Sequence, residues 1–337
     1  MKLNFDNICM ELAFNEAFKY MLLTYPNPAV GAVVTYKNKI VAIEAHKKAG
    51  TSHAEVLALI SAYENISKET VDFDRLDAVK AHNFLLSLPK GYFKNCEIFV
   101  TLEPCSHFGK TPSCAKLLSK LNLKRVVIGS KDPIDKHSGG FTLLKNSKID
   151  VLYSDFNTSV LIEPFKIWQK RSFVVFKLAQ TINGVIGGGY LSSKESLIHT
   201  HKIREVSTTL LIGGNTVRVD KPTLDCRFIG KKAPDITIYS KKRDFDNSIP
   251  LFKIKNREVN ITDCLNLLNN KGLVLVEGGE GMLKALESRI DWLLTYQTPK
   301  IREKSVSYFL NIDLEFLKIV KNSKDLIIWS RVKYRKN

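Results

Sequence analysis

The sequence predicts a two-domain α/β protein, because strand-like and helix-like segments alternate in its first half and the alternation restarts in its second. The chain has 337 residues, which is long for one compact domain and sufficient for two. Hydrophobic residues make up 44% and charged residues 25%, as in globular proteins with sizeable cores. We therefore expect domains at 1–154 and 173–337, joined by a linker helix within 155–172.

The first half predicts an α/β sandwich with a largely parallel sheet. An amphipathic helix opens the chain, and β-rich segments at 29–36 and 39–46 form a hairpin around the turn Lys37-Asn38. Further strands are expected at 96–102 and 124–130, and helices at 53–63 and 114–121. The charged segment between 64 and 95 is expected to hold one more helix.

The second half predicts another α/β series. Strand-like runs lie at 172–181, 208–214, 233–240 and 272–279, and helix-like runs at 195–206 and 281–290. The glycines after the last of these strands, in EGG (277–279), precede a helix, so backbone amides there could hold a phosphate. Glycines after strands more often only form turns. The absence of a GxGxxG sequence excludes an ordinary Rossmann dinucleotide domain.

The formal charge of +17 is the one unusual bulk property. It fits a nucleic-acid partner, small anionic substrates or a solvated basic surface. The basic residues are spread along the chain rather than gathered in one block, which favours the last interpretation. No apolar run approaches the length of a membrane span, and the N-terminal segment lacks the features of a signal peptide. We therefore expect a cytoplasmic protein with no membrane partner.

Cysteine usage points to metal binding or catalysis. Six cysteines in a chain that we expect to be cytoplasmic argue against a disulfide framework. Cys96, Cys105 and Cys114 cluster in the sequence. The others are scattered and are expected to be small buried hydrophobic residues: Cys9, Cys226 and Cys264.

Two short motifs predict a zinc-dependent hydrolytic deaminase. His53 and Glu55 form an HxE sequence, and Cys105 follows a proline and precedes Cys114 by nine positions. One imidazole and two thiolates would hold zinc and leave a fourth position for water, while Glu55 transfers the proton. A structural site closed by Cys96 is the alternative. Both motifs follow a strand-like run and open a helix-like run, and Glu55 has no role in a structural site, so we favour the catalytic interpretation.

The complete motifs resemble the RibD family of bifunctional riboflavin-biosynthesis proteins. The strings PNPAVG, SHAE and PCSHFGKTPSC resemble its deaminase half, and KLAQTINGVI, GGNTVRVDKPTLDCR and VEGGEGMLKALE its reductase half. The resemblance implies a cytidine-deaminase-like α/β/α sandwich with one zinc ion, followed by a dihydrofolate-reductase-like domain that uses NADPH. It also implies a small phosphorylated substrate and association into a homo-oligomer.

The reactions implied by the resemblance are consecutive. The first is hydrolytic deamination of 2,5-diamino-6-(5-phosphoribosylamino)pyrimidin-4(3H)-one to 5-amino-6-(5-phosphoribosylamino)uracil. The second is reduction of the ribosyl group to a ribityl group by NADPH. Four departures from the family pattern stand out. Ile134 replaces a usual asparagine, and Tyr190 replaces a usual tryptophan. The stretch GVIGGGYLSSKES is shorter than usual, and the 64–95 segment is longer than is typical, as in a surface insertion.

The resemblance also implies roles for individual residues. His53, Cys105 and Cys114 would bind zinc, and Glu55 would be the proton donor. Contacts to the deaminase substrate are implied at Asn27, His46, His107, Lys110 and Asp132. Contacts to NADPH are implied at Tyr190, Thr216, Asp220, Ser240, Gly279, Glu280, Gly281, Met282, Leu283, Lys284 and Ala285. Contacts to the reductase substrate are implied at Gly188, Arg204, Leu224, Arg227 and Glu277.

The chemistry of several of these residues suits the implied role. Asn27 offers a donor and an acceptor to a pyrimidine edge. Lys110 can meet a phosphate, and the guanidinium groups of Arg204 and Arg227 bind phosphate bidentately.

Two other functions stay open at this point. A nucleobase deaminase acting on RNA would use the basic charge for phosphate contacts. A zinc-stabilised nucleic-acid-binding module would need a fourth protein ligand and no role for Glu55. Our preferred interpretation involves no nucleic acid.

Overall fold

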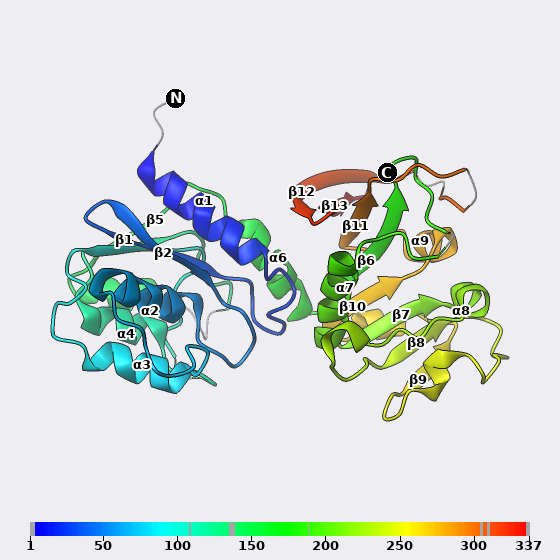
Figure 1. Ribbon diagram of the computed structural model, residues 1–337, viewed down its shortest axis with the longest axis horizontal. Helices are drawn as coiled ribbons and strands as arrows, with labels where there is room; N and C mark the ends of the chain where they lie inside the picture. Colours follow the sequence, from blue (N-terminus) through cyan, green and yellow to red (C-terminus); the bar gives the residue numbers. More distant parts are fainter. Residues whose placement is uncertain are drawn as a thin grey trace. The chain divides into compact units, whose positions relative to one another are not determined.

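The computed structural model describes residues 4–107, 109–134, 139–187, 189–303, 306–308 and 311–334. The chain divides into two compact units, 1–166 and 167–337 (Figure 1). The division falls within α6 (Ser159–Trp168), inside the segment where we expected a linker helix. In the described part of the chain, no helix is both long and apolar enough to cross a membrane.

The first unit is built on a five-stranded sheet in the order β2-β1-β3-β4-β5. β1 (Gly31–Tyr36) pairs antiparallel with β2 (Lys39–Ala45) and with β3 (Cys96–Val100), whereas β3, β4 (Arg125–Ile128) and β5 (Asp150–Tyr153) are parallel. The expected hairpin is confirmed, and its turn residues Lys37 and Asn38 both adopt positive φ, 49° and 61°. We did not predict β5, whose four partly exposed residues show little periodicity.

Helices cover both faces of this sheet (Figure 1). α1 (Phe5–Phe18) packs on one face, where its Met10 and Ala13 join Val33 and Phe99 in an apolar cluster. α2 (Ala54–Ser67) and α4 (Cys114–Leu121) contribute to the larger core on the opposite face, together with α3 (Ala78–Ser87) and α5 (Gly140–Asn146). α1 approaches so closely that a Cβ on Gly31 would lie 2.0 Å from the carbonyl oxygen of Ala13. The unit is therefore an α/β/α sandwich.

The second unit contains an eight-stranded sheet in the order β12-β13-β11-β6-β10-β7-β8-β9. β6 (Ser172–Thr181), β7 (Thr209–Gly213), β8 (Ile236–Tyr239) and β10 (Gly272–Glu277) occupy the four expected strand segments. β9 (Val259–Thr262), β11 (Trp292–Thr298), β12 (Asp313–Asn322) and β13 (Asp325–Lys333) were not predicted. The six strands that are neighbours in the order β11-β6-β10-β7-β8-β9 are parallel to one another. β13 is antiparallel to both of its neighbours, β11 and β12.

Within the described part of this unit, three α-helices accompany the sheet: α7 (Lys194–Val206), α8 (Gly214–Asp220) and α9 (Glu280–Ala285). α9 is shorter than the expected helix at 281–290. Short 3-10 helices lie at Arg227–Ile229, Pro250–Lys253 and Asn266–Asn269. The central strand β10 is buried along its whole length, and its register places Glu277 beside Lys177 of β6. Charged side chains thus meet at the carboxyl end of β10, an end of the kind where α/β folds place ligands.

Candidate zinc and reductase sites

The three expected zinc ligands come together at the starts of two helices. His53 is the N-cap of α2, Cys114 is the first residue of α4, and Cys105 lies in the loop that follows β3. Their ligand atoms all lie within 4.8 Å of one another. The Nδ1 atom of His53 is 3.7 Å from Cys105 Sγ and 3.4 Å from Cys114 Sγ. Two thiols and one imidazole fit tetrahedral zinc with one open position. Cys96 instead belongs to the apolar core.

Thr111 orients the histidine ligand and was not predicted. Its hydroxyl lies 3.0 Å from His53 Nε2, on the side of the ring opposite to the cysteines. With Nδ1 bound to a metal, Nε2 would carry the ring proton and donate a hydrogen bond to the Thr111 hydroxyl. Such outer contacts fix the ring and tautomer of a metal-binding histidine. Thr111 lies within the string PCSHFGKTPSC, so its position in that motif was the available signal.

Glu55 lies in the first turn of α2, next to the ligand group, and only 3% of it is exposed. Burial raises the pKa of its carboxyl group to about 6. A carboxyl group with a pKa near neutrality can both accept and release a proton, which a proton carrier requires. The group that could hold a metal contains His53, Cys105 and Cys114 but not Glu55. The geometry therefore leaves Glu55 beside the candidate ligand group and outside it.

His46 and Asn27 lie beside the zinc ligands. The rings of His46 and His53 are 5.2 Å apart in an edge-on contact. His46 is buried, which lowers its pKa to about 4 and keeps its imidazole neutral. Its Nε2 atom is 3.1 Å from Asn27 Nδ2, and its Nδ1 atom is 3.1 Å from the carbonyl oxygen of Ser52. The structure thus places two of the expected substrate contacts next to the metal site.

The other expected deaminase contacts lie on two loops. His107 is half-buried and Lys110 is exposed, and both lie between the cysteine ligands. Asp132 is buried after β4, and its Oδ1 accepts a hydrogen bond from the amide of Ile134 at 2.9 Å. The isoleucine that replaces the usual asparagine thus contacts Asp132 through its backbone.

Glu103 organises the loop that carries Asp132, and sequence reasoning missed it. Its buried carboxylate accepts hydrogen bonds from the amides of Asp132 at 3.3 Å, Gly139 at 3.0 Å and Phe141 at 3.0 Å. The Tyr153 hydroxyl donates to it from 3.4 Å. Glu103 directly precedes the Pro-Cys sequence, so it links the strand that leads to Cys105 with the loop around Asp132.

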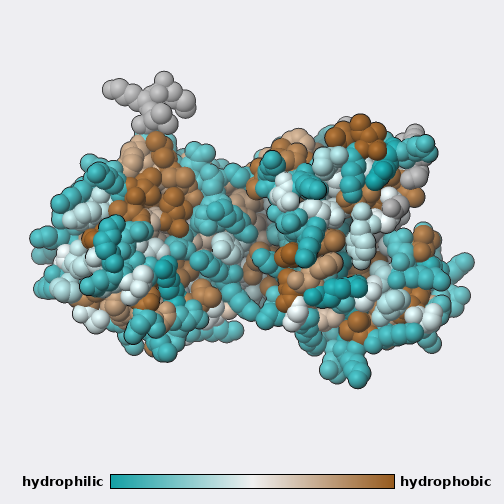
Figure 2. All heavy atoms as spheres, in the orientation of Figure 1, coloured by the Kyte–Doolittle hydropathy of each residue, from teal (hydrophilic) through white to brown (hydrophobic). Residues whose placement is uncertain are grey.

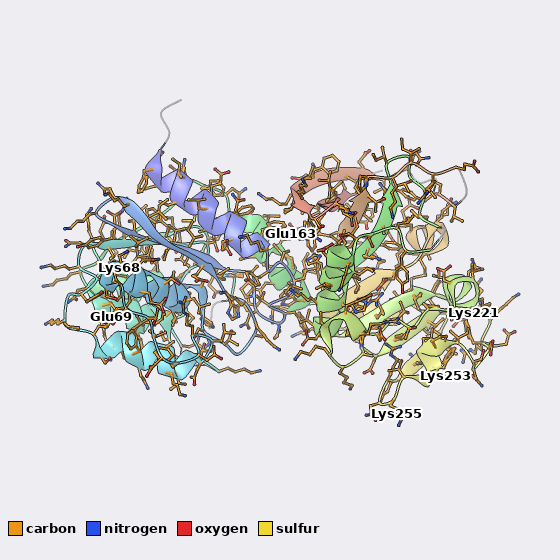
Figure 3. The ribbon with its side chains drawn as sticks, viewed as in Figure 1. Lys68, Glu69, Glu163, Lys221, Lys253 and Lys255 are labelled. Carbon is orange, nitrogen blue, oxygen red and sulfur yellow. The ribbon has the colours of Figure 1, made fainter. Side chains whose placement is uncertain are left out.

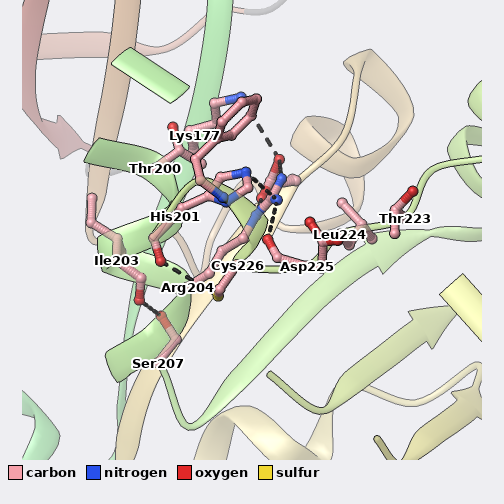
Figure 4. A network of polar contacts seen from close by, with 12 residues as sticks. Lys177, Thr200, His201, Ile203, Arg204, Ser207, Thr223, Leu224, Asp225 and Cys226 are labelled. Carbon is pink, nitrogen blue, oxygen red and sulfur yellow. Dashed lines mark hydrogen bonds and ion pairs between the residues drawn. The ribbon is translucent and has the colours of Figure 1, made fainter. Parts of the chain in front are cut away.

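A buried ion network occupies the second unit. Arg204 donates two hydrogen bonds to Glu277, from Nε at 2.6 Å and from Nη2 at 2.9 Å. Lys177 Nζ lies 3.7 Å from the same carboxylate. Figure 4 shows Lys177, His201 and Arg204 converging from β6 and α7. Burial would raise the pKa of Glu277, but Arg204 and Lys177 outweigh it and lower the pKa to about 2.

Lys177 is the residue of this network that sequence reasoning missed. Burial lowers the pKa of its amino group, while the charge of Glu277 opposes that effect. The signal was a lysine inside the otherwise apolar run of β6. A buried charged group whose pKa is shifted by burial and by a specific charge partner is a candidate functional residue, so we treat the network as a candidate for substrate contact.

The remaining expected substrate contacts differ in accessibility. Arg204 is largely engaged by Glu277 and by the Asp225 carbonyl oxygen, which accepts a hydrogen bond from Nη1 at 3.0 Å. Arg227 is half exposed and pairs with the Asp225 carboxylate at 2.8 Å. Leu224 is buried in a left-handed conformation, φ 55°. Gly188 lies outside the described residues.

Most of the expected NADPH contacts lie just after the carboxyl ends of β7, β8 and β10, which are neighbours in the sheet, whereas Tyr190 lies between β6 and α7 and Asp220 is the last residue of α8. A Cβ on Gly213 or Gly278 would lie 2.6 Å or 2.9 Å from Met282 Cγ, and a Cβ on Gly214 would lie 2.5 Å from Ser240. Thr216 Oγ1 is 3.8 Å from the same positions on Gly213 and Gly278. Small residues thus let Thr216, Ser240 and Met282 approach the strand ends, where a dinucleotide would bind. Asp220 and Tyr190 are exposed, Tyr190 by 74%.

Hydrophilic residues cover much of the visible surface (Figure 2). Figure 2 shows hydrophilic residues distributed over the visible face of each unit. Figure 3 places Lys221, Lys253 and Lys255 at the periphery of the second unit, and all three are exposed.

Both units match known protein families. The zinc-binding region of cytidine and deoxycytidylate deaminases matches residues 3–130, and the RibD C-terminal domain matches residues 172–302. The riboflavin biosynthesis protein RibD of Aquifex aeolicus is 31% identical over 347 aligned residues, covering 90% of this chain and 89% of that protein. The RibD of Bacillus amyloliquefaciens is 32% identical over 60% of this chain and 50% of its own length.

Solved structures show the same fold along nearly the whole chain. The diaminohydroxyphosphoribosylaminopyrimidine deaminase/5-amino-6-(5-phosphoribosylamino)uracil reductase of Thermotoga maritima superimposes with a TM-score of 0.68 and 24% identity, over 98% of this chain and 99% of that one. RibD of Acinetobacter baumannii gives a TM-score of 0.66 and 22% identity, over 99% of this chain and 100% of that one.

The fold and the two sites define an enzyme in which a zinc-dependent deaminase is joined to an NADPH-dependent reductase. The expected fold class is confirmed, with a cytidine-deaminase-like first domain and a dihydrofolate-reductase-like second domain. The chain belongs to the RibD family, the bifunctional deaminases and reductases of riboflavin biosynthesis.

Proposed function

We propose that this enzyme converts 2,5-diamino-6-(5-phosphoribosylamino)pyrimidin-4(3H)-one to 5-amino-6-(5-phosphoribosylamino)uracil and then reduces the ribosyl group of that product. The observation that carries the proposal is the group of His53, Cys105 and Cys114 with the buried carboxyl group of Glu55 beside it. Family membership supports the substrate assignment, because the Thermotoga maritima protein of the same fold is named for these two substrates.

In the deaminase domain, we assign proton transfer to Glu55. Zinc held by His53, Cys105 and Cys114 would supply a water molecule of lowered pKa for attack on the amidine carbon. Glu55 would accept one proton of that water on its carboxylate and deliver it to the departing amino group, which leaves as neutral ammonia, while the second proton of the water passes to a ring nitrogen as the new carbonyl group forms. Its pKa near 6 suits both halves of this transfer at neutral pH.

The surrounding residues would orient the substrate. Asn27 and His46, next to the zinc ligands, face the pyrimidine. His107 and Lys110 lie on the loop between the cysteines, and Lys110, which is exposed, is suited to the phosphate. Asp132, held through Glu103, contacts the ribose.

In the reductase domain, the protein binds and orients two ligands. NADPH supplies the hydride for C1′ of the ring-opened ribosylamine. The residues that we assign to cofactor binding are Tyr190, Thr216, Asp220, Ser240 and the loop from Gly279 to Ala285. Arg227 binds the phosphate, since its guanidinium group is half exposed, whereas Arg204, Glu277 and Lys177 line the buried side of the substrate site. Leu224 and Gly188 are also assigned to this site, from the family resemblance alone.

The two competing functions are not favoured. A zinc-stabilised binding module would need a fourth protein ligand, and the group found among the described residues has three. An RNA-directed deaminase would leave the second domain without a role, yet that domain matches the RibD C-terminal domain. A homo-oligomeric state, a cytoplasmic location and the lack of a nucleic-acid partner remain predictions.

A coupled assay tests the proposal. The purified chain is given the diaminopyrimidine substrate with and without NADPH, and ammonia release and NADPH oxidation are followed separately. We expect ammonia release in both cases and NADPH oxidation only after deamination. A chain that releases no ammonia, or that oxidises NADPH without prior deamination, would contradict the assignment.

Single substitutions separate the two sites. Glu55→Gln should keep its zinc and lose ammonia release by a factor of about 100 to 10,000, the usual range for a general acid–base group. Its NADPH oxidation should be normal when the deaminated intermediate is supplied. Arg227→Ala should release ammonia at the normal rate and should oxidise NADPH more slowly when the deaminated intermediate is supplied. Retained deamination in Glu55→Gln would exclude the assigned proton transfer, and loss of zinc would indicate a folding defect instead.

A further inference from the structure

The segment 68–77, which links α2 to α3, holds the residue that directly precedes the zinc ligand His53. Ser52 is completely buried. Its backbone amide donates to the carbonyl oxygen of Leu76 at 3.1 Å, and its hydroxyl donates to the carbonyl oxygen of Arg75 at 2.7 Å. The inserted segment therefore contributes two hydrogen-bond acceptors to the wall of the deaminase site.

Arg75 attaches this segment to α2. Its Nη2 forms an ion pair with Glu64, and its Nη1 donates to the Ser61 hydroxyl at 3.3 Å. Glu64 also accepts a hydrogen bond from the amide of Val71 at 3.1 Å. The guanidinium group thus fixes the same residue whose carbonyl oxygen receives the Ser52 hydroxyl. Movement at Arg75 would be transmitted directly to Ser52.

From Ser52 the contacts continue to Asn27 through His46. The carbonyl oxygen of Ser52 can only accept a hydrogen bond, so His46 Nδ1, 3.1 Å away, carries the proton. His46 Nε2 then presents its lone pair to Asn27 Nδ2, 3.1 Å away, and the amide group of Asn27 donates. Two hydrogen bonds with Thr24, of 2.8 Å and 2.9 Å, hold the backbone of Asn27.

This chain of contacts decides which atom of Asn27 is available to a ligand. Its Nδ2 faces His46, and its Oδ1 has no hydrogen-bond partner among the described residues. A carboxamide held in this orientation offers an acceptor and disfavours a ligand that presents a lone pair. The complementary ligand edge is therefore an N–H donor.

We propose that the segment 68–77 is a positioning element of the deaminase, which acts through Ser52 and His46 to point Asn27 Oδ1 at an N–H group of the pyrimidine. Arg75 is the positioning residue that keeps this segment in place. The inference rests on the proposed function, because it assigns the ligand of Asn27 to the pyrimidine substrate. It gives a role to the segment that is longer than the family pattern.

The kinetic test uses the full-length, zinc-loaded chain and the diaminopyrimidine substrate. In Arg75→Met the deaminase KM should rise about five- to tenfold, the effect of one weakened hydrogen bond in the binding site. The deaminase kcat should stay within about twofold because Glu55 and the ligands are untouched. Lys80→Met is the matched control: Lys80 pairs with Asp77 in the same region, 3.8 Å apart, and does not contact Ser52. It should leave KM unchanged.

Two further readouts separate positioning from a general structural effect. Zinc content and NADPH oxidation with supplied intermediate should be the same in wild type, Arg75→Met and Lys80→Met. An unchanged KM in Arg75→Met, a loss confined to kcat, or a loss of zinc would each overturn the proposal. A wild-type chain without ammonia release would instead refute the proposed function.

The tautomer of His46 gives a test that does not depend on activity. Nitrogen chemical shifts of histidines in the labelled wild-type chain distinguish a protonated Nδ1 from a protonated Nε2. The chain has seven histidines, and the His46 signals are identified by their loss in His46→Gln. We expect a proton on Nδ1 and none on Nε2. A proton on Nε2 would reverse the orientation of Asn27 and overturn the proposal.

Discussion

Replacing Glu277 with glutamine tests whether the buried ion network stabilises the reductase domain. The carboxylate lies between Arg204 and Lys177 in a site that is almost closed to water. Glutamine has nearly the same shape but carries no charge, so Glu277→Gln leaves two buried cations without their counterion. Removing one partner of a buried ion pair is among the most destabilising single changes in proteins.

The size of the effect follows from the pKa of Glu277. In the folded chain it falls from the usual value of 4.5 to about 2. At about 1.36 kcal/mol per pKa unit, the ionised carboxylate contributes about 3 kcal/mol to the free energy of unfolding. Because the folded pKa lies below the unfolded pKa, the contribution is complete well above pH 4.5 and is lost as the pH falls towards 2. The variant should therefore lose about 3 kcal/mol at pH 7, and less at pH 4.

Urea unfolding followed by tryptophan fluorescence measures this quantity in the correct domain. The three tryptophans of the chain are Trp168, Trp292 and Trp329, and all lie in the unit 167–337. Glu315→Gln is the matched control, because Glu315 also pairs with one arginine and one lysine, Arg331 at 2.7 Å and Lys333 at 3.3 Å, but is far more exposed. The control should lose less than about 1 kcal/mol.

Two results would refute this reasoning. If Glu277→Gln lowers the free energy of unfolding no more than Glu315→Gln does, burial does not strengthen the network. If Glu277→Gln lowers the free energy of unfolding equally at pH 7 and pH 4, the destabilisation comes from a change in shape or hydrogen bonding and not from the loss of the Glu277 charge.

Three further predictions concern the deaminase domain. Thr111→Val removes the hydrogen-bond partner of His53 Nε2. Its zinc affinity, measured by competition with a chelator, should fall about 10- to 100-fold. Thr111→Ser keeps the hydroxyl group and should keep the wild-type zinc affinity. Chelation of zinc should abolish ammonia release and leave NADPH oxidation with supplied intermediate unchanged; a parallel loss of both activities would contradict independent sites. Glu103→Gln weakens the acceptor of three backbone amides. Amide hydrogen exchange at Gly139 and Phe141 should therefore accelerate, and the deaminase KM should rise. Unchanged exchange at these two amides would exclude the assigned role of Glu103.

The zinc site was predictable because its chemistry lies in short local strings. His53 and Glu55 are two positions apart at the start of α2, and Cys105 and Cys114 flank one loop before α4. A histidine and two cysteines near a glutamate define a small set of reactions, whichever fold carries them. Hydrophobic periodicity likewise located the hairpin and most helices of the first domain.

The supporting contacts were not predictable, because they join residues that are far apart in the chain. Arg204 and Glu277 are 73 positions apart, and Thr111 and His53 are 58 positions apart. Lys177 becomes part of the network only because the register of β6 against β10 sets it beside Glu277. A single sequence does not specify strand register, and a shift of one residue would turn the side chain to the opposite face of the sheet.

By itself, the amino-acid sequence predicted the group of His53, Cys105 and Cys114 that the fold brings together, the assignment of Glu55 as proton carrier, and the two-domain α/β organisation, since these predictions depend on residue type and local periodicity. The tertiary structure alone decided that His46 lies between Ser52 and Asn27, which carries our inference about its tautomer, and that Arg204, Lys177 and Glu277 form one network. Such assignments depend on which donor meets which acceptor, and only the folded packing of distant segments settles that.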